Sequence, residues 1–160
     1  MHILSRDGLV EVRGLAIKFN NMKFIKILTH PILLIISFSM IIIIGQKFSG
    51  FYIMYVFMAL FELHIHAVWA FIGAILLAVG HQRKENDKAK GMISITGSLL
   101  LVLSVFTFFY NDKDHYNWDT FNQARSLISL GIFGMFWIVF VIRNMTSIMK
   151  FNKQKILQLD

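Results

Sequence analysis

The sequence predicts an all-α integral membrane protein, in which four transmembrane helices form an up-down-up-down bundle with both termini in the cytoplasm. The first observation is composition: 56% of the 160 residues are hydrophobic and 16% are charged, whereas soluble domains are about half apolar and a quarter charged. The second is that the apolar residues gather in long stretches separated by short polar segments. The third is that lysine and arginine flank these stretches. A chain of this length has room for one domain.

The net charge of +7 and the absence of cysteine limit the classes of function. A nucleic-acid-binding protein gathers its basic residues on a soluble face, but here they flank apolar spans, where they set topology and meet anionic headgroups. We therefore expect the lipid bilayer as a partner and no nucleic acid. Without cysteine, the chain forms no disulfide, thiolate metal site or iron–sulfur cluster.

The predicted transmembrane domain covers 27–143 and follows a basic leader, residues 1–26. We expect the leader to be either an amphipathic helix at the membrane interface or a segment that precedes a natural translation start at Met22. The first span covers about 27–46. Pro31 is compatible with this span because it falls in the first turn, where its missing N–H breaks no helical hydrogen bond.

The second predicted span covers about 51–80 and contains no lysine or arginine. It is longer than the ~20 residues that cross a bilayer as a helix. The polar turn at 46–50 is short, so we expect the first two spans to be antiparallel neighbours.

The third span covers about 91–110 and carries serine, threonine and glycine on one helical stripe. Small residues in such a stripe let membrane helices approach closely. The fourth span covers about 124–142, with Ser126, Leu130 and Gly134 on one face. A basic tail, 144–160, follows.

The distribution of charge predicts the orientation. The amino terminus, the loop at 81–90 and the carboxyl tail are rich in lysine and arginine, whereas the loop at 111–123 is acidic on balance. The positive-inside rule places the first three in the cytoplasm and the acidic loop outside. All four tyrosines then fall near the outer interface, which amphipathic rings prefer. We expect a plasma (inner) membrane protein with both ends inside.

The middle of the second span holds Glu62, His64 and His66. In a continuous helix Glu62 and His66 share a face, whereas His64 lies about 200° round the axis from His66. The group would lie about 15 to 20 Å from Tyr52 and about 22 to 28 Å from His81, close to the bilayer middle. Ionisable groups at this depth typically line a bundle interior or a wet cavity.

This arrangement predicts a proton or cation path through Glu62 and His66, with His64 as a weaker member. The same pair is a weak candidate for holding a metal ion together with ligands from another span. The structural alternative is that both side chains only hydrogen-bond to hydroxyls of the third span.

Two further pairs of residues are candidate sites. His30 and His81 both fall at the inner surface of neighbouring spans, so they are weak candidates for the axial ligands of a haem. Arg125 opens the fourth span beside the acidic loop, where a contact with Asp119 or Asp114 would form an outer gate.

The sequence leaves three functions open. The first is an oligomeric channel or transport component that moves protons or cations past the Glu62 and His66 pair. The second is a non-catalytic accessory or scaffolding subunit of a larger membrane complex, and the third is a membrane-embedded haem or metal protein. We expect a homo-oligomer or a membrane-protein partner. No enzyme motif is visible and no cofactor is required by the sequence.

Overall fold

The computed structural model describes residues 27–46, 48–83, 88–112 and 116–156, with side chains up to Asn152. The predictions for the leader and for the last residues of the tail lie outside these ranges. The described chain is mostly helical, and its elements are α2 (Pro31–Ser39), β1 (Ile42–Ile44), β2 (Ser49–Phe51), α3 (Tyr52–Phe61), α4 (Ile65–Gln82), α5 (Lys88–Tyr110), η1 (Trp118–Asn122) and α6 (Ala124–Ile156). Three of them, α4, α5 and α6, are long and apolar enough to cross a membrane. The chain is thus a helical membrane protein.

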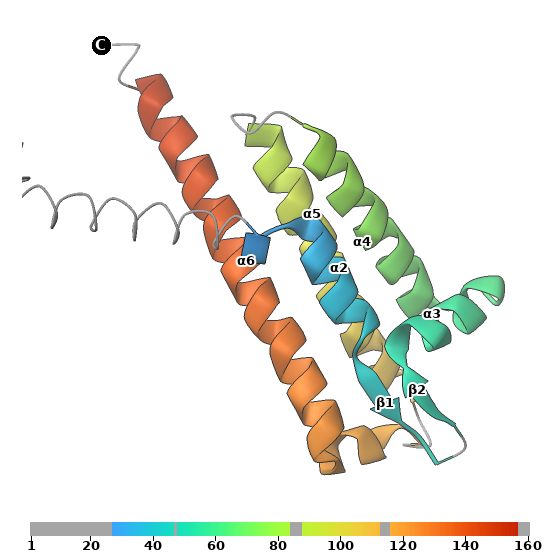
Figure 1. Ribbon diagram of the computed structural model, residues 1–160. Helices are drawn as coiled ribbons and strands as arrows, with labels where there is room; N and C mark the ends of the chain where they lie inside the picture. Colours follow the sequence, from blue (N-terminus) through green and yellow to red (C-terminus); the bar gives the residue numbers. More distant parts are fainter. Residues whose placement is uncertain (1–26, 47, 84–87, 113–115, 157–160) are drawn as a thin grey trace, which may run out of the picture.

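The helices α4 and α5 lie side by side along their length (Figure 1). Glycines make this contact close, because a Cβ added at Gly73 would lie 2.8 Å from the carbonyl oxygen of Gly97, and one added at Gly97 would lie 2.9 Å from that of Gly73. Nearer the end of α4, a Cβ at Gly80 would lie 2.6 Å from Oγ of Ser94. The stripe of small residues predicted in the third span therefore packs on α4. We call this contact the α4–α5 seam.

The helix α6 packs more loosely than α5. Of the residues in its most apolar window, 17% are buried, against 33% for α5. Its buried aromatic side chains include Phe133 and Phe140, and Figure 1 shows its lower half closest to the other elements. The helix also continues without interruption to Ile156, well past the predicted end of the fourth span at 142.

The first predicted span is not a full-length helix in the described residues. The helix α2 ends at Ser39, and the chain becomes extended through the run Ile41–Ile44. Four consecutive β-branched residues favour extended backbone over helix. The nine residues of α2 span only about 14 Å, roughly half of the hydrocarbon thickness. The predicted bundle of four full-length spans is thus replaced, in this part of the chain, by a short helix and a hairpin.

The hairpin pairs β1 with β2 antiparallel, with Ile43 opposite Gly50. Its other edge is closed by side chains from distant elements. Ser129 Oγ accepts a hydrogen bond from the N–H of Ile42 at 2.9 Å, and Thr120 Oγ1 accepts one from the N–H of Ile44 at 2.9 Å. Backbone groups without water need partners inside the protein. The hairpin is therefore fixed to η1 and α6 as well as to itself.

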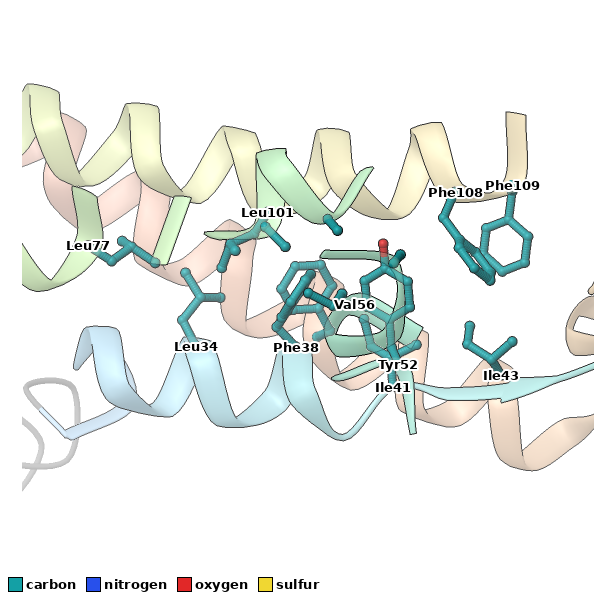
Figure 2. Packing of buried hydrophobic residues seen from close by; sticks show 14 of the residues in the cluster. Leu34, Phe38, Ile41, Ile43, Tyr52, Val56, Leu77, Leu101, Phe108 and Phe109 are labelled. Carbon is teal, nitrogen blue, oxygen red and sulfur yellow. The ribbon is translucent and has the colours of Figure 1, made fainter. Parts of the chain in front are cut away.

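The hydrophobic core lies where α2, the hairpin, α3 and α5 meet. Figure 2 shows the ring of Phe38 beside that of Tyr52, with Leu34 and Leu101 nearby. The rings of Phe38 and Tyr52 meet edge to face, with centroids 5.2 Å apart, and Tyr52 also contacts Phe108 at 5.2 Å. Such edge-to-face pairs add about 0.5–1.5 kcal/mol to the burial of the rings. The core thus attaches the start of α3 to the end of α5.

The second predicted span is interrupted. The helix α3 ends at Phe61, α4 begins at Ile65, and Leu63 has a positive φ of 54°. The N–H of Leu63 donates to the carbonyl of Leu60, and the N–H of His64 donates to that of Ala59. These are the two hydrogen bonds of a helix end capped by a left-handed residue. The continuous helix expected over 51–80 is therefore wrong, and α3 points to the side of the bundle (Figure 1).

Candidate functional site

Glu62, His64 and His66 gather at the turn between α3 and α4. The Nε2 of His64 lies 2.7 Å from Oε2 of Glu62, within hydrogen-bond distance. The rings of His64 and His66 stack with centroids 5.8 Å apart and planes at 15°. The turn produces this order of contacts, because Leu63 reverses the chain so that positions 62 and 64 face each other.

The pairing predicted from a continuous helix is not the one observed. We expected Glu62 beside His66 and His64 on the far side, since residues four apart share a helical face. In the structure Glu62 contacts His64, and His64 lies against His66. The physical reason is the left-handed residue Leu63, which ends one helix and starts another within the cluster.

The helix bounds around the cluster also differ from the prediction. The helix α4 alone is 18 residues long, about 27 Å, which is close to the ~30 Å hydrocarbon thickness. Glu62 and His64 precede its first residue and are exposed, with 72% and 56% of their side-chain surface accessible. The pair therefore lies at one end of a potential span, and the argument that placed it at the bilayer middle no longer applies.

His66 is more enclosed than its two neighbours. Its ring meets that of Phe108 edge to face, with centroids 5.2 Å apart, and its Nε2 is buried without a partner in the described chain. Its carbonyl accepts a hydrogen bond from Ser104 Oγ at 2.6 Å, and Ser104 Oγ lies 2.8 Å from the hydroxyl of Tyr52. Because the single hydrogen of Ser104 goes to the carbonyl, Tyr52 donates to Ser104. This chain of hydrogen bonds joins α3, α4 and α5.

A metal ion at this cluster stays a prediction. Among the described residues, no three side chains of His, Asp or Glu converge as a metal site would require. Glu62 and His66 would therefore need a ligand from outside the described residues.

The other two predicted pairs lie at opposite ends of the bundle. The rings of His30 and His81 are in contact, with centroids 4.5 Å apart and planes at 64°. They are neighbours, as expected, but a haem between them would require the rings to separate. Arg125 and Asp119 are both exposed and form no ion pair in the described structure, so the outer gate stays a prediction.

A groove between α5 and α6 was not anticipated from the sequence. It has a volume of about 690 Å³ and is closed at one end by η1. Its lining is almost entirely apolar and mainly aromatic, and consists of Val102, Val105, Phe106, Phe109, Tyr110, Trp118, Phe121, Leu130, Phe133, Gly134 and Trp137. The sequence placed Leu130 and Gly134 on one face of a helix, but the aromatic residues come from three separate segments that only the fold brings together.

The α6 side of this groove leads onto an open helical face. Nothing in the described structure lies within 4 Å of a Cβ added at Gly131 or Gly134. These two glycines are three residues apart, so they share one face of the helix. We call this surface the α6 glycine face.

Comparisons with known proteins gave no match to a protein-family model, a curated protein or a solved structure.

Proposed function

We propose that this protein is a membrane-embedded assembly subunit, which docks a transmembrane helix of a partner on the α6 glycine face and the adjoining groove. The partner is a second copy of the chain or another membrane protein. The observation that carries this proposal is the contrast among the glycines of the bundle.

A glycine inside a helix destabilises it by roughly 0.5–1 kcal/mol relative to alanine. Gly73, Gly80 and Gly97 have a compensating role, because a Cβ at each would approach a neighbouring atom to within 3 Å. Gly131 and Gly134 have no such neighbour in the described chain. Glycines on membrane helices let another backbone approach closely, so the α6 glycine face has the features of half a helix–helix contact.

The groove supports the same interpretation. Apolar surface alone does not indicate a partner in a membrane, since lipid tails are as apolar as leucine. A hollow of about 690 Å³ beside the two glycines is a more specific feature. A docked helix would fill the hollow with side chains.

Proton or cation transport past Glu62, His64 and His66 stays an untested alternative. This alternative requires a paired carboxyl and imidazole at the middle of a span, whereas the pair in the structure is exposed and precedes the first residue of α4. The docking proposal does not depend on this cluster.

The test is a substitution that fills the face without touching the fold. Gly134→Leu places a side chain where the described chain leaves open space, so the variant folds but its partner no longer approaches closely. Tagged full-length wild type and variant are purified from native membranes in mild detergent, and the mass of each complex is measured. We expect the wild type to run as a complex and Gly134→Leu to run as a single chain.

Ile132→Phe is the matched control, because it adds bulk on the exposed side of the same helix about 160° round the axis from Gly134. Since the chain has no cysteine, Gly131→Cys gives a single thiol whose disulfide reports a second copy. A wild type that is a single chain in native membranes, or a complex that survives Gly134→Leu, would contradict the proposal.

A further inference from the structure

At the basic end of the bundle, a second cavity opens between α2, α4, α5 and α6. Its volume is about 370 Å³, within the ~300–1,000 Å³ range of small-ligand sites. Its lining residues include His30, His81, Lys90, Ser94, Arg143 and Asn144. Unlike the groove between α5 and α6, this cavity is polar and brings together residues from the start of α2, the end of α4, the start of α5 and the middle of α6.

The charged residues in the described lining of this cavity are both cations. Lys90 and Arg143 are half-buried in its wall, and none of its eleven described lining residues is acidic. The acidic residues in the described part of the chain, Glu62, Asp112 and Asp119, all lie at the other end of the bundle. The described lining of the cavity therefore supplies cations and no carboxylate.

The two histidines add donors to the same cavity. His30 precedes α2, and its Nδ1 accepts a hydrogen bond from the N–H of Ile32 at 3.3 Å, which leaves Nε2 as the ring donor. The ring of His30 contacts that of His81. Desolvation, together with the neighbouring His81 and Lys90, lowers the pKa of His30. Two cationic side chains and two imidazole rings therefore line one cavity, and all four can donate hydrogen bonds to an anion.

The position of the cavity along the helices corresponds to the edge of the hydrocarbon region. Arg143 comes 19 residues after the first residue of α6, at Ala124, or about 29 Å along the axis. This is close to the ~30 Å thickness of the hydrocarbon core. Lys90 is in the first turn of α5. The cations thus lie at the level that phosphate headgroups occupy.

We propose that this cavity binds the phosphate of an anionic phospholipid headgroup, with the acyl chains lying against the apolar surface of the bundle. A guanidinium, an ammonium and imidazole N–H groups are the donors that proteins use for phosphate. Basic pockets between transmembrane helices at this level are suited to lipid headgroups. Free inorganic phosphate carries the same chemistry but lacks the chains that the membrane would supply. This inference is independent of partner docking, because it concerns the opposite end of the bundle.

The test measures binding to the purified full-length protein in a neutral detergent. Short-chain phosphatidylglycerol, phosphatidylcholine and inorganic phosphate are titrated separately, and bound molecules are counted by native mass spectrometry. We expect saturable binding of phosphatidylglycerol, much weaker binding of phosphatidylcholine and none of inorganic phosphate. Lys90→Gln and Arg143→Gln should each weaken phosphatidylglycerol binding about fivefold, the factor that corresponds to about 1 kcal/mol per cation near an anionic surface.

Lys150→Gln is the matched control, because Lys150 is an exposed cation on α6 outside the cavity. It should leave binding unchanged. Arg143→Lys keeps the charge, so it should retain more phosphatidylglycerol binding than Arg143→Gln. If Arg143→Gln does not fold, Arg143→Lys and Lys90→Gln are compared with the wild type instead. Equal binding of phosphatidylcholine, equal binding of inorganic phosphate, or equal loss in Lys150→Gln would each overturn the proposal.

Discussion

The α4–α5 seam and the α6 glycine face use the same residue type in opposite surroundings. In the seam, Gly73 and Gly97 approach so closely that an added Cβ would meet the opposite carbonyl oxygen within 3 Å. On α6, an added Cβ at Gly131 or Gly134 meets nothing within 4 Å in the described chain. A pattern of small residues therefore predicts that a helix can be approached closely, but it does not tell whether the approaching helix belongs to the same molecule.

The largest expected effect comes from making one substitution on both surfaces. Gly97→Ala should destabilise the protein by about 1–3 kcal/mol, because its new Cβ forces two backbones apart. Gly131→Ala should instead stabilise the isolated chain by about 0.4–1 kcal/mol, because alanine restricts the unfolded chain and fits the open helical position. The free energy of unfolding, measured by denaturant titration in mixed micelles, checks both values.

The opposite signs are the informative result. If both substitutions destabilise the purified single chain, the α6 glycine face is already covered within the molecule, and the contrast between the two surfaces fails. If both stabilise it, the seam is looser than the backbone distances at Gly73 and Gly97 indicate.

The next effect tests whether hydrogen bonds extend the seam beyond its glycines. Ser104 Oγ donates to the carbonyl of His66 at 2.6 Å and accepts from the hydroxyl of Tyr52. Ser104→Ala should cost about 1 kcal/mol, since it leaves the buried Tyr52 hydroxyl without its partner. Thr107→Ala is the control, because Thr107 Oγ1 donates only within its own helix. Unfolding titrations of the two variants give the comparison.

A double substitution separates coupling from simple loss of packing. Adding Tyr52→Phe to Ser104→Ala removes both members of the pair, so the double variant should lose less stability than the sum of the two single losses. Strictly additive losses would show that the bond between these residues contributes nothing to the seam.

The sequence predicts the long spans of this fold better than its interruptions. The sequence predicts the third span at about 91–110, and α5 covers Lys88–Tyr110. This span is predictable because a long apolar stretch is bounded by charged residues before it and by a polar loop after it. The hydrophobicity of the run Ile41–Ile44 instead predicts that it belongs to a helical span. Its extended form depends on β2 and on hydrogen bonds from α6 and η1, which are distant in sequence.

The candidate site was predicted in composition but not in geometry. Glu62, His64 and His66 do gather. A continuous helix predicts that Glu62 contacts His66, whereas in the structure Glu62 contacts His64. The interruption has no glycine or proline to indicate it, since the left-handed position is occupied by Leu63. Leucine rarely adopts this conformation because it costs roughly 1–2 kcal/mol. Local sequence therefore argued for a continuous helix, and only the packing of α3 and α4 against the rest of the bundle favours the break.

The smallest expected effect is that of replacing Leu63. It tests whether α4, and with it the α4–α5 seam, begins after Leu63. Leu63→Gly removes the penalty of the positive φ, but it also raises the entropy lost on folding by roughly 0.5–1 kcal/mol. Leu63 is 75% exposed, so little buried surface is lost. The free energy of unfolding should therefore stay unchanged or rise by up to about 1 kcal/mol.

Met58→Gly provides the comparison, because Met58 is an exposed residue inside α3. There glycine should cost about 1 kcal/mol, as in any exposed helix interior. If one helix ran through both positions, the two substitutions would cost the same amount. A neutral or stabilising Leu63→Gly beside a destabilising Met58→Gly supports the break, and with it the contact of Glu62 with His64 rather than His66. Equal losses would restore the continuous span and return the carboxyl and imidazole pair to the middle of the bilayer.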